Sequence, residues 1–159
     1  GVEVDAPHFS EFDVPLYNGD VEDSVGIPEG AQRLADKLEE ADGFVIVSPE
    51  YNSSIPGVLK NAIDWVSRPE PDEPRLAAFD GKVAALMSAS PSGLGGLRGL
   101  FALRSVMQNI GVIVVPELVT VKGAPDAFDE SGELREESLR ARVTAVGERL
   151  VELAGRLRD

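Results

Sequence analysis

Polar and aromatic side chains that could bind a small molecule follow the apolar stretch 44–47. The residues directly after this stretch are Ser48, Pro49, Glu50, Tyr51, Asn52, Ser53 and Ser54. A tyrosine ring can stack on a flat ligand, and an amide and hydroxyls can exchange hydrogen bonds with its edge. The prolines at 49 and 56 restrict the backbone between them. This set of groups suits a planar heteroaromatic ligand, although a plain surface turn remains the alternative for Tyr51.

A second loop whose residues could bind a ligand follows the apolar stretch 83–87. Residues 88–96 read Ser-Ala-Ser-Pro-Ser-Gly-Leu-Gly-Gly and lead into a helical pattern. Glycines allow the backbone to approach a ligand closely, while serine hydroxyls and helix N-terminal amides supply hydrogen-bond donors. Taken alone, such a loop can equally serve turn geometry only. Two such loops after consecutive strands would lie at one sheet edge and could form one site.

Strands and helices are expected to alternate along the chain. Apolar runs predict strands near 44–48, 83–87 and 112–115, the last interrupted by Pro116 and resuming at 118–121. Amphipathic patterns predict helices near 29–41, 56–67, 95–110 and 136–157. Val2 and Val4 alternate with acidic residues, as in a short strand, while 8–26, a proline-rich stretch around 69–74 and 122–133 are expected to be irregular. Ser54 is a candidate cap for the 56–67 helix.

This alternation is typical of an α/β fold with a doubly wound parallel sheet. Continuous apolar runs indicate strands that are buried on both faces. Ligands bind such sheets beyond the carboxyl ends of the strands, where both loops are expected. We treat residues 1–159 as a single domain.

Composition excludes several classes of function. The formal net charge of −13 disfavours nucleic acid and anionic membranes as partners. The absence of cysteine excludes disulfides and thiol catalysis, and the single histidine, His8, disfavours a multi-histidine metal site or a Ser-His-Asp triad. No run of about 18 apolar residues and no basic, apolar leader is present, so we expect a cytoplasmic protein.

The residues from Ser48 to Trp65 resemble the signature of the NADPH-dependent FMN reductases, which are flavodoxin-like enzymes that include azo-, quinone- and chromate-reducing members. The Ser/Gly loop and the stretch 15–18, Pro-Leu-Tyr-Asn, also match in order. The resemblance implies FMN as cofactor and a set of residues around its isoalloxazine ring. These cofactor-binding residues are Pro49, Glu50, Tyr51, Asn52 and Ser53 on one side, with Ser88 and Ser90 on the other.

The implied activity is hydride transfer from NADPH or NADH to FMN and then to a flavin, a quinone or a similar small acceptor. The cofactor carries this chemistry, so no catalytic side chain and no metal is expected. A flavodoxin-type electron carrier, or a flavin-less interaction module on the same fold, remains the alternative. A shuttle flavodoxin is expected to hold FMN between two aromatic rings. The 88–96 loop has none, which favours the enzyme.

The resemblance also implies a strand and a phosphate-binding loop ahead of Gly1. In the flavodoxin order 2-1-3-4-5 that strand is central. We therefore expect an N-terminally incomplete sheet, in which Val2–Val4 would be the second strand.

Apolar residues on more than one helix face predict an assembly. Trp65 lies off the stripe of Leu59, Ile63 and Val66, and the 97–110 helix is apolar around more than one face. The resemblance implies a homodimer or homotetramer, with Arg98 and Glu117 as candidate charged contacts.

Overall fold

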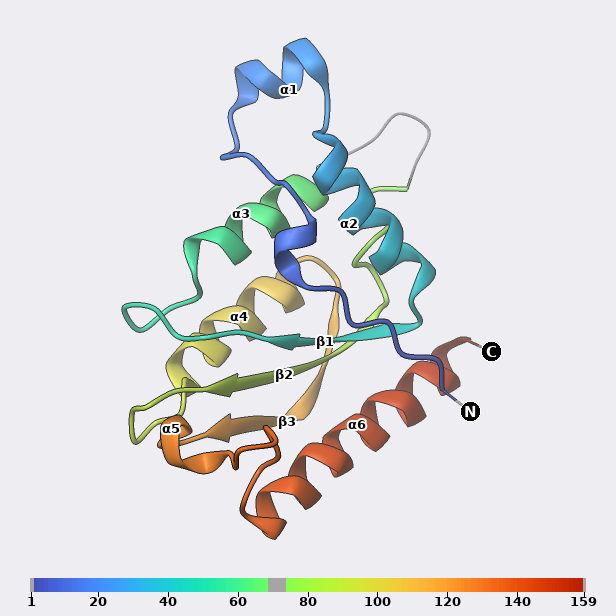
Figure 1. Cartoon of the computed structure of the whole chain (residues 1–159). Coiled ribbons are helices and arrows are strands. Elements are labelled where there is room, and N and C mark those ends of the chain that lie inside the picture. Colours follow the sequence, from blue (N-terminus) through green and yellow to red (C-terminus); the bar gives the residue numbers. More distant parts are fainter. Residues whose placement is uncertain (1, 69–73, 159) are drawn as a thin grey trace.

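A parallel three-stranded sheet forms the centre of the molecule. The computed structural model describes residues 2–68 and 74–158. Strands β1 (Gly43–Val47), β2 (Val83–Ala89) and β3 (Ile113–Val121) lie side by side in the order β1-β2-β3, and both neighbouring pairs are parallel. The carboxyl ends of all three strands point to the same edge (Figure 1). The predicted parallel α/β sheet is confirmed.

Helices cover both faces of this sheet. Helices α2 (Glu29–Glu40), α3 (Gly57–Val66) and α4 (Leu97–Asn109) lie on one face, and α6 (Glu137–Arg158) lies on the other (Figure 1). Ala84 and Leu86 of β2 pack into the first core, while Val83 and Ala85 pack against α6. The alternation of side chains along a strand explains why one apolar strand fills two cores. The doubly wound arrangement is therefore confirmed.

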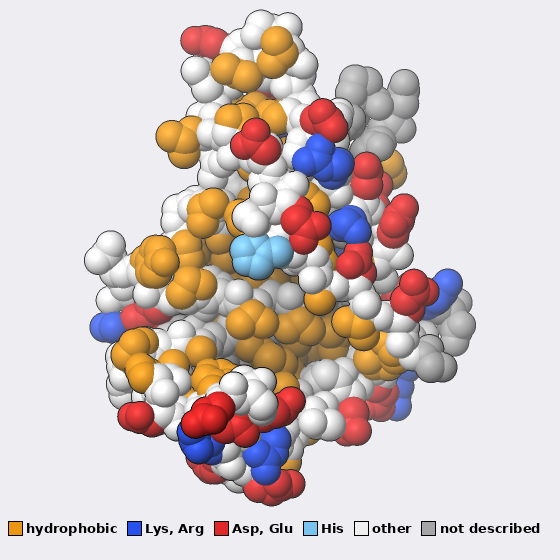
Figure 2. Space-filling view, viewed as in Figure 1, with side chains coloured by type: hydrophobic (Ala, Val, Ile, Leu, Met, Phe, Trp, Pro, Cys, Tyr) orange, Lys and Arg blue, Asp and Glu red, His pale blue; other side chains and the backbone are white. Residues whose placement is uncertain are grey.

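Strand β1 is less buried than the sequence predicts. Phe44 and Ile46 pack toward α2 and α3, but Val45 is 45% exposed and Val47 is 69% exposed. Apolar side chains gather on the surface between β1 and α6 (Figure 2). Helix α6 crosses β2 and β3 and reaches β1 near Gly43, and among the described residues no other helix covers Val45 and Val47.

The first 26 residues differ from the expectation. Residues 2–7 form no strand, because an alternating segment needs a neighbouring strand for its backbone hydrogen bonds. They run instead past α2, where Asp5 pairs with Lys37. The stretch 8–26, expected to be irregular, contains a 3₁₀ turn (Phe9–Glu11) capped by His8 and helix α1 (Gly19–Val25) capped by Asn18. Local caps thus create structure that hydrophobic periodicity does not reveal.

The third strand also differs, because β3 continues through Pro116 without a break. The register between β2 and β3 shifts between Ala84 and Leu86, opposite the proline. Proline is tolerated because β3 is an edge strand, where a missing N–H interrupts no ladder. Arg104 of α4 donates to the carbonyl oxygens of Val115 and Pro116, both at 2.9 Å.

Three further points complete the fold. The expected loop 122–133 contains the short helix α5 (Ala124–Ala127). Most of the proline-rich stretch around 69–74 lies outside the described residues. Within the part of the chain that the structure describes, no helix is both long and apolar enough to cross a membrane.

Candidate functional site

The chain reverses direction in a tight turn immediately after β1. The backbone N–H of Tyr51 donates to the oxygen of Ser54, and that of Ser54 donates to the oxygen of Tyr51, both at 3.0 Å. Asn52 and Ser53 have φ angles of 51° and 65°. Two left-handed residues between paired ends define a type I′ hairpin, in which asparagine is favoured. Ser54 therefore closes the turn and does not cap α3, which follows Pro56 without a side-chain cap.

The turn presents several groups to solvent. The Tyr51 ring is 59% exposed, and Pro49, Asn52 and Ser53 are exposed as well. Among the described residues, the side chains of Tyr51, Asn52 and Ser53 have no hydrogen-bond partner. A rigid backbone that displays a ring, an amide and a hydroxyl without internal partners is suited to receive a ligand.

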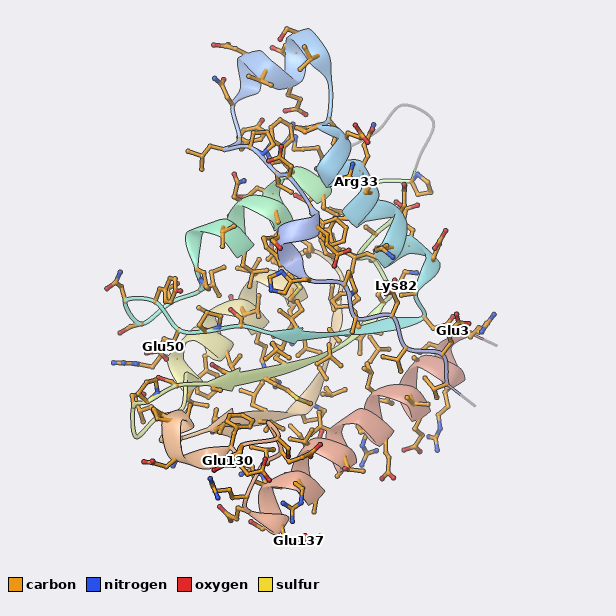
Figure 3. All side chains as sticks on the ribbon, viewed as in Figure 1. Glu3, Arg33, Glu50, Lys82, Glu130 and Glu137 are labelled. Atoms are coloured by element: carbon orange, nitrogen blue, oxygen red, sulfur yellow. The ribbon has the colours of Figure 1, made fainter. Side chains whose placement is uncertain are left out.

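Glu50 behaves differently from its neighbours, because its side chain is turned inward. The carboxylate is 7% exposed, pairs with Arg98 at 2.7 Å (Oε1 to Nη2) and accepts the Gly99 backbone N–H at 3.1 Å (Oε2). Figure 3 shows Glu50 at the carboxyl edge of the sheet beside the start of α4, away from Lys82 at the other edge. The Gly99 amide, followed by Arg98, lowers the pKa of Glu50 although desolvation opposes this. The Glu50 carboxylate is thus bound by groups of the protein and is largely shielded from solvent.

The 88–96 loop packs beneath the first turn of α4. Ser88 is 2% exposed, and its Oγ has no hydrogen-bond partner within the described residues. Gly96 has a φ of +88°, and a Cβ at this position would lie 1.9 Å from Ser88 Oγ. Ser90 is only half-buried, and its Oγ accepts the N–H of Ser92 at 3.2 Å. Ser90 is therefore placed to meet a ligand at this edge, whereas Ser88 is covered by Gly96.

The first turn of α4 joins the two loops. Glu50 reaches it from the loop after β1, and Gly96 joins it to the loop after β2. The sequence analysis missed this junction and the part that Gly99 plays in it. The available signal was a further glycine, Gly99, three residues after Gly96 and within the first helical turn. Arg98, expected at a subunit interface, pairs with Glu50 within the chain, and its side chain stays 54% exposed, so the expected interface contact stays a prediction.

Trp65 is buried by its own chain. It is 0% exposed, its Nε1 donates to the Pro15 oxygen at 2.8 Å, and its ring meets Tyr17 edge-to-face at 4.9 Å. Asn61 also holds this segment, since it donates to the Pro15 oxygen and accepts the Tyr17 N–H. The inference that Trp65 marks a subunit interface is therefore wrong, because the 15–17 segment already covers the ring.

The groups at the carboxyl edge fit the ring system of a flavin in part. The exposed Tyr51 ring is flat, and the neighbouring amide and hydroxyl can meet the heteroatoms of an isoalloxazine edge. The Ser88 hydroxyl is buried, so on that side the fit depends mainly on the half-buried Ser90 and the loop backbone. Across residues 2–68 and 74–158, no three His, Asp or Glu side chains are grouped as a metal site.

Comparison with known proteins gives a consistent result. The family model of the NADPH-dependent FMN reductases matches residues 1–126. An NAD(P)H-dependent FMN reductase of Pseudomonas aeruginosa is 40% identical over 129 residues, which are 80% of this chain and 66% of that protein. A quinone reductase of Escherichia coli is 37% identical over 142 residues, which are 86% of this chain and 73% of that protein. The chain thus matches about two thirds to three quarters of the length of these relatives.

A solved structure supports the same assignment. The flavoenzyme NAD(P)H:(acceptor) oxidoreductase FerB of Paracoccus denitrificans superposes with a TM-score of 0.72 at 27% identity. The superposition covers 95% of this chain and 78% of that structure. Since both the sequence signature around the Tyr51 turn and the parallel sheet that carries it match, this chain belongs to the NADPH-dependent FMN reductase family.

Proposed function

We propose that this protein is an FMN-dependent oxidoreductase that takes a hydride from NADPH or NADH and passes reducing equivalents to a small acceptor such as a quinone or a flavin. The observation that carries the proposal is the type I′ turn with the exposed Tyr51, placed beside the Ser/Gly loop at the carboxyl edge of the sheet. Membership of the FMN reductase family supports the cofactor and the donor. FMN, when bound, supplies the redox chemistry.

The residues of this chain then have binding roles. Tyr51 and Asn52 would contact the ring of FMN, assisted by Pro49 and Ser53, whose exposed positions leave them free for contact. Ser90 would approach from the loop after β2. Ser88 and the Glu50 side chain are buried, so we propose that they contribute to FMN binding indirectly, without contact to the flavin. No side chain of the site is assigned a proton-transfer step.

The electron-carrier alternative is less well supported. The 88–96 loop contains no aromatic residue, so only one ring, Tyr51, is available from these two loops. An unobstructed flavin face allows a nicotinamide to approach, as a reductase requires. We further propose that the protein works in the cytoplasm, where NAD(P)H is available, and cell fractionation would test this.

The double substitution Tyr51→Ala and Asn52→Ala is expected to weaken FMN binding. The loss of a stacking ring and of an amide partner predicts at least a tenfold rise in Kd, since each such contact contributes about 1 kcal/mol or more. Flavin fluorescence titration measures the Kd, and NADPH oxidation with an added quinone measures the activity. Val151→Ala on α6 serves as the control, because this exposed side chain lies on the other face of the sheet. An unchanged Kd in the double variant would exclude the turn as the ring site.

We also propose a homodimer, or a homotetramer built from such dimers, that pairs through the α3 and α4 surface. Val58 and Phe101 on these helices are each 57% exposed, and a groove of about 310 Å³ runs between the helices, lined by Ile63 and Val106 among others. Exposed aromatic and aliphatic side chains are typical of protein interfaces. A stable dimer would bury above about 1,200 Å² in total.

Phe101→Asp is expected to shift the protein from dimer to monomer, because a buried unpaired carboxylate strongly disfavours an interface. Light scattering at micromolar concentration measures the mass. Val151→Asp on α6, at a side chain that is 43% exposed, is the matched control and should leave the mass unchanged. A wild-type mass equal to that of the monomer would contradict the dimer.

A further inference from the structure

The N-cap residue of α4 has no side chain that could cap the first turn of the helix. This residue is Gly96, which offers no side-chain acceptor to the free backbone amides. A larger residue does not fit there, because a Cβ on Gly96 would overlap Ser88. A helix N-terminus favours a negatively charged group, so the amide of Gly99 must find its acceptor elsewhere.

Glu50 supplies that acceptor from a different loop. Its Oε2 accepts the Gly99 N–H at 3.1 Å, while its Oε1 accepts Arg98 Nε at 2.9 Å. Gly99 also lets the turn approach closely, since a Cβ there would lie 3.2 Å from Glu50 Cβ and 3.2 Å from the Ser54 oxygen. The Glu50 carboxylate and the Gly99 contact together fix the base of the Tyr51–Ser54 turn against α4.

We propose that Glu50 is a positioning residue, whose carboxylate clamps the Tyr51–Ser54 turn to the first turn of α4 and so sets the FMN affinity of the exposed turn without direct contact to the flavin. The part that concerns FMN rests on the proposed function. The clamp itself is a property of the protein without ligand. Its strength depends on charge, because the acceptor is a carboxylate facing both a guanidinium and a helix N-terminus.

The clamp is expected to weaken in acid. Arg98 is the charged side chain that faces Glu50, and the Gly99 amide holds the pKa of Glu50 below its ordinary value of 4.5. A group whose pKa is lowered by folding stabilises the folded state above its ordinary pKa. That stabilisation disappears as the pH falls through the lowered pKa. The window of the effect therefore begins near 4.5 and extends below it.

Graded substitutions test the clamp. Glu50→Ala removes both bonds and is expected to raise the Kd for FMN about tenfold, while Glu50→Gln keeps a neutral acceptor for Gly99 and should raise it about threefold. Arg98→Ala should raise the Kd for FMN about as much as Glu50→Gln does, since the hydrogen bond from the Gly99 amide to Glu50 remains in both. Glu148→Gln, at an exposed carboxylate of α6, is the matched control and should have no effect. Circular dichroism establishes that each variant is folded.

Hydrogen exchange of the ligand-free protein provides an independent readout. In Glu50→Ala, the amides of Tyr51, Ser54 and Gly99 should exchange faster than in wild type, while those of α6 stay unchanged. The Kd of wild type should rise relative to that of Glu50→Gln as the pH is lowered from about 4.5 downward, because Glu50 loses its charge in this window and glutamine has none to lose. A merely structural glutamate would not produce this difference in pH profile.

The outcomes are distinct. Unchanged exchange at Tyr51 and Ser54 in Glu50→Ala would refute the clamp. Faster exchange with unchanged FMN affinity would refute its positioning role. If wild type binds no FMN at all, the proposed function fails together with the effect on affinity, and the exchange pattern still decides whether the clamp exists.

Discussion

Replacing Gly96 by alanine is expected to lower the free energy of unfolding by about 2–5 kcal/mol. A left-handed backbone at a non-glycine residue costs about 1–2 kcal/mol, and overpacking in a closed space costs about 1–3 kcal/mol more. Both apply here, because Gly96 has a φ of +88° and an added Cβ would lie 1.9 Å from Ser88 Oγ. Urea unfolding followed by the fluorescence of Trp65, the one tryptophan of the chain, measures the loss.

A control separates the two causes. Gly123→Ala adds the same methyl group at a φ of +55° with nothing within 4 Å, so only the backbone cost of about 1–2 kcal/mol is expected. Combining Gly96→Ala with Ser88→Gly should recover part of the loss, because the overlapping side chain is then absent. Equal costs for Gly96→Ala and Gly123→Ala would show that the contact with Ser88 is unimportant.

The substitution Trp65→Ala is expected to cost about 3–5 kcal/mol, as for other large buried aromatic residues. The ring is 0% exposed and carries both the contact with Tyr17 and the bond to the Pro15 oxygen. Since a domain of this size is stable by about 5–15 kcal/mol, the variant should retain its fold only marginally. Urea unfolding monitored by circular dichroism measures the loss. Limited proteolysis should show faster cleavage within 15–25, because Trp65 holds the start of this segment through Pro15 and Tyr17.

Trp65→Phe is the matched control. It keeps most of the ring but loses the N–H donor, and the Pro15 oxygen still accepts Asn61 Nδ2 at 2.8 Å. A cost of about 1 kcal/mol is therefore expected, with little change in proteolysis. A Trp65→Ala variant that is as stable and as protease-resistant as wild type would show that the 15–25 segment is held by other contacts.

The site could be predicted only as far as its backbone position. Order along the chain places the Tyr51 turn and the Ser/Gly loop after consecutive parallel strands, and parallel strands end at one edge. Which side chains face that edge depends on contacts between distant residues. Glu50 turns inward because α4 offers a free amide and Arg98, and Ser88 is covered because Gly96 lies on it.

By itself, the sequence determined the three parallel strands, the main helices and the family, because these follow from local apolar patterns and from a contiguous signature around Tyr51. Tertiary structure alone decided which apolar residues are covered. Val45 and Val47 look like core residues but are exposed on an edge strand, whereas Trp65 looks like an interface residue but is covered by Pro15 and Tyr17. Burial depends on which distant segment packs above a residue, and periodicity along one element carries no information about that segment.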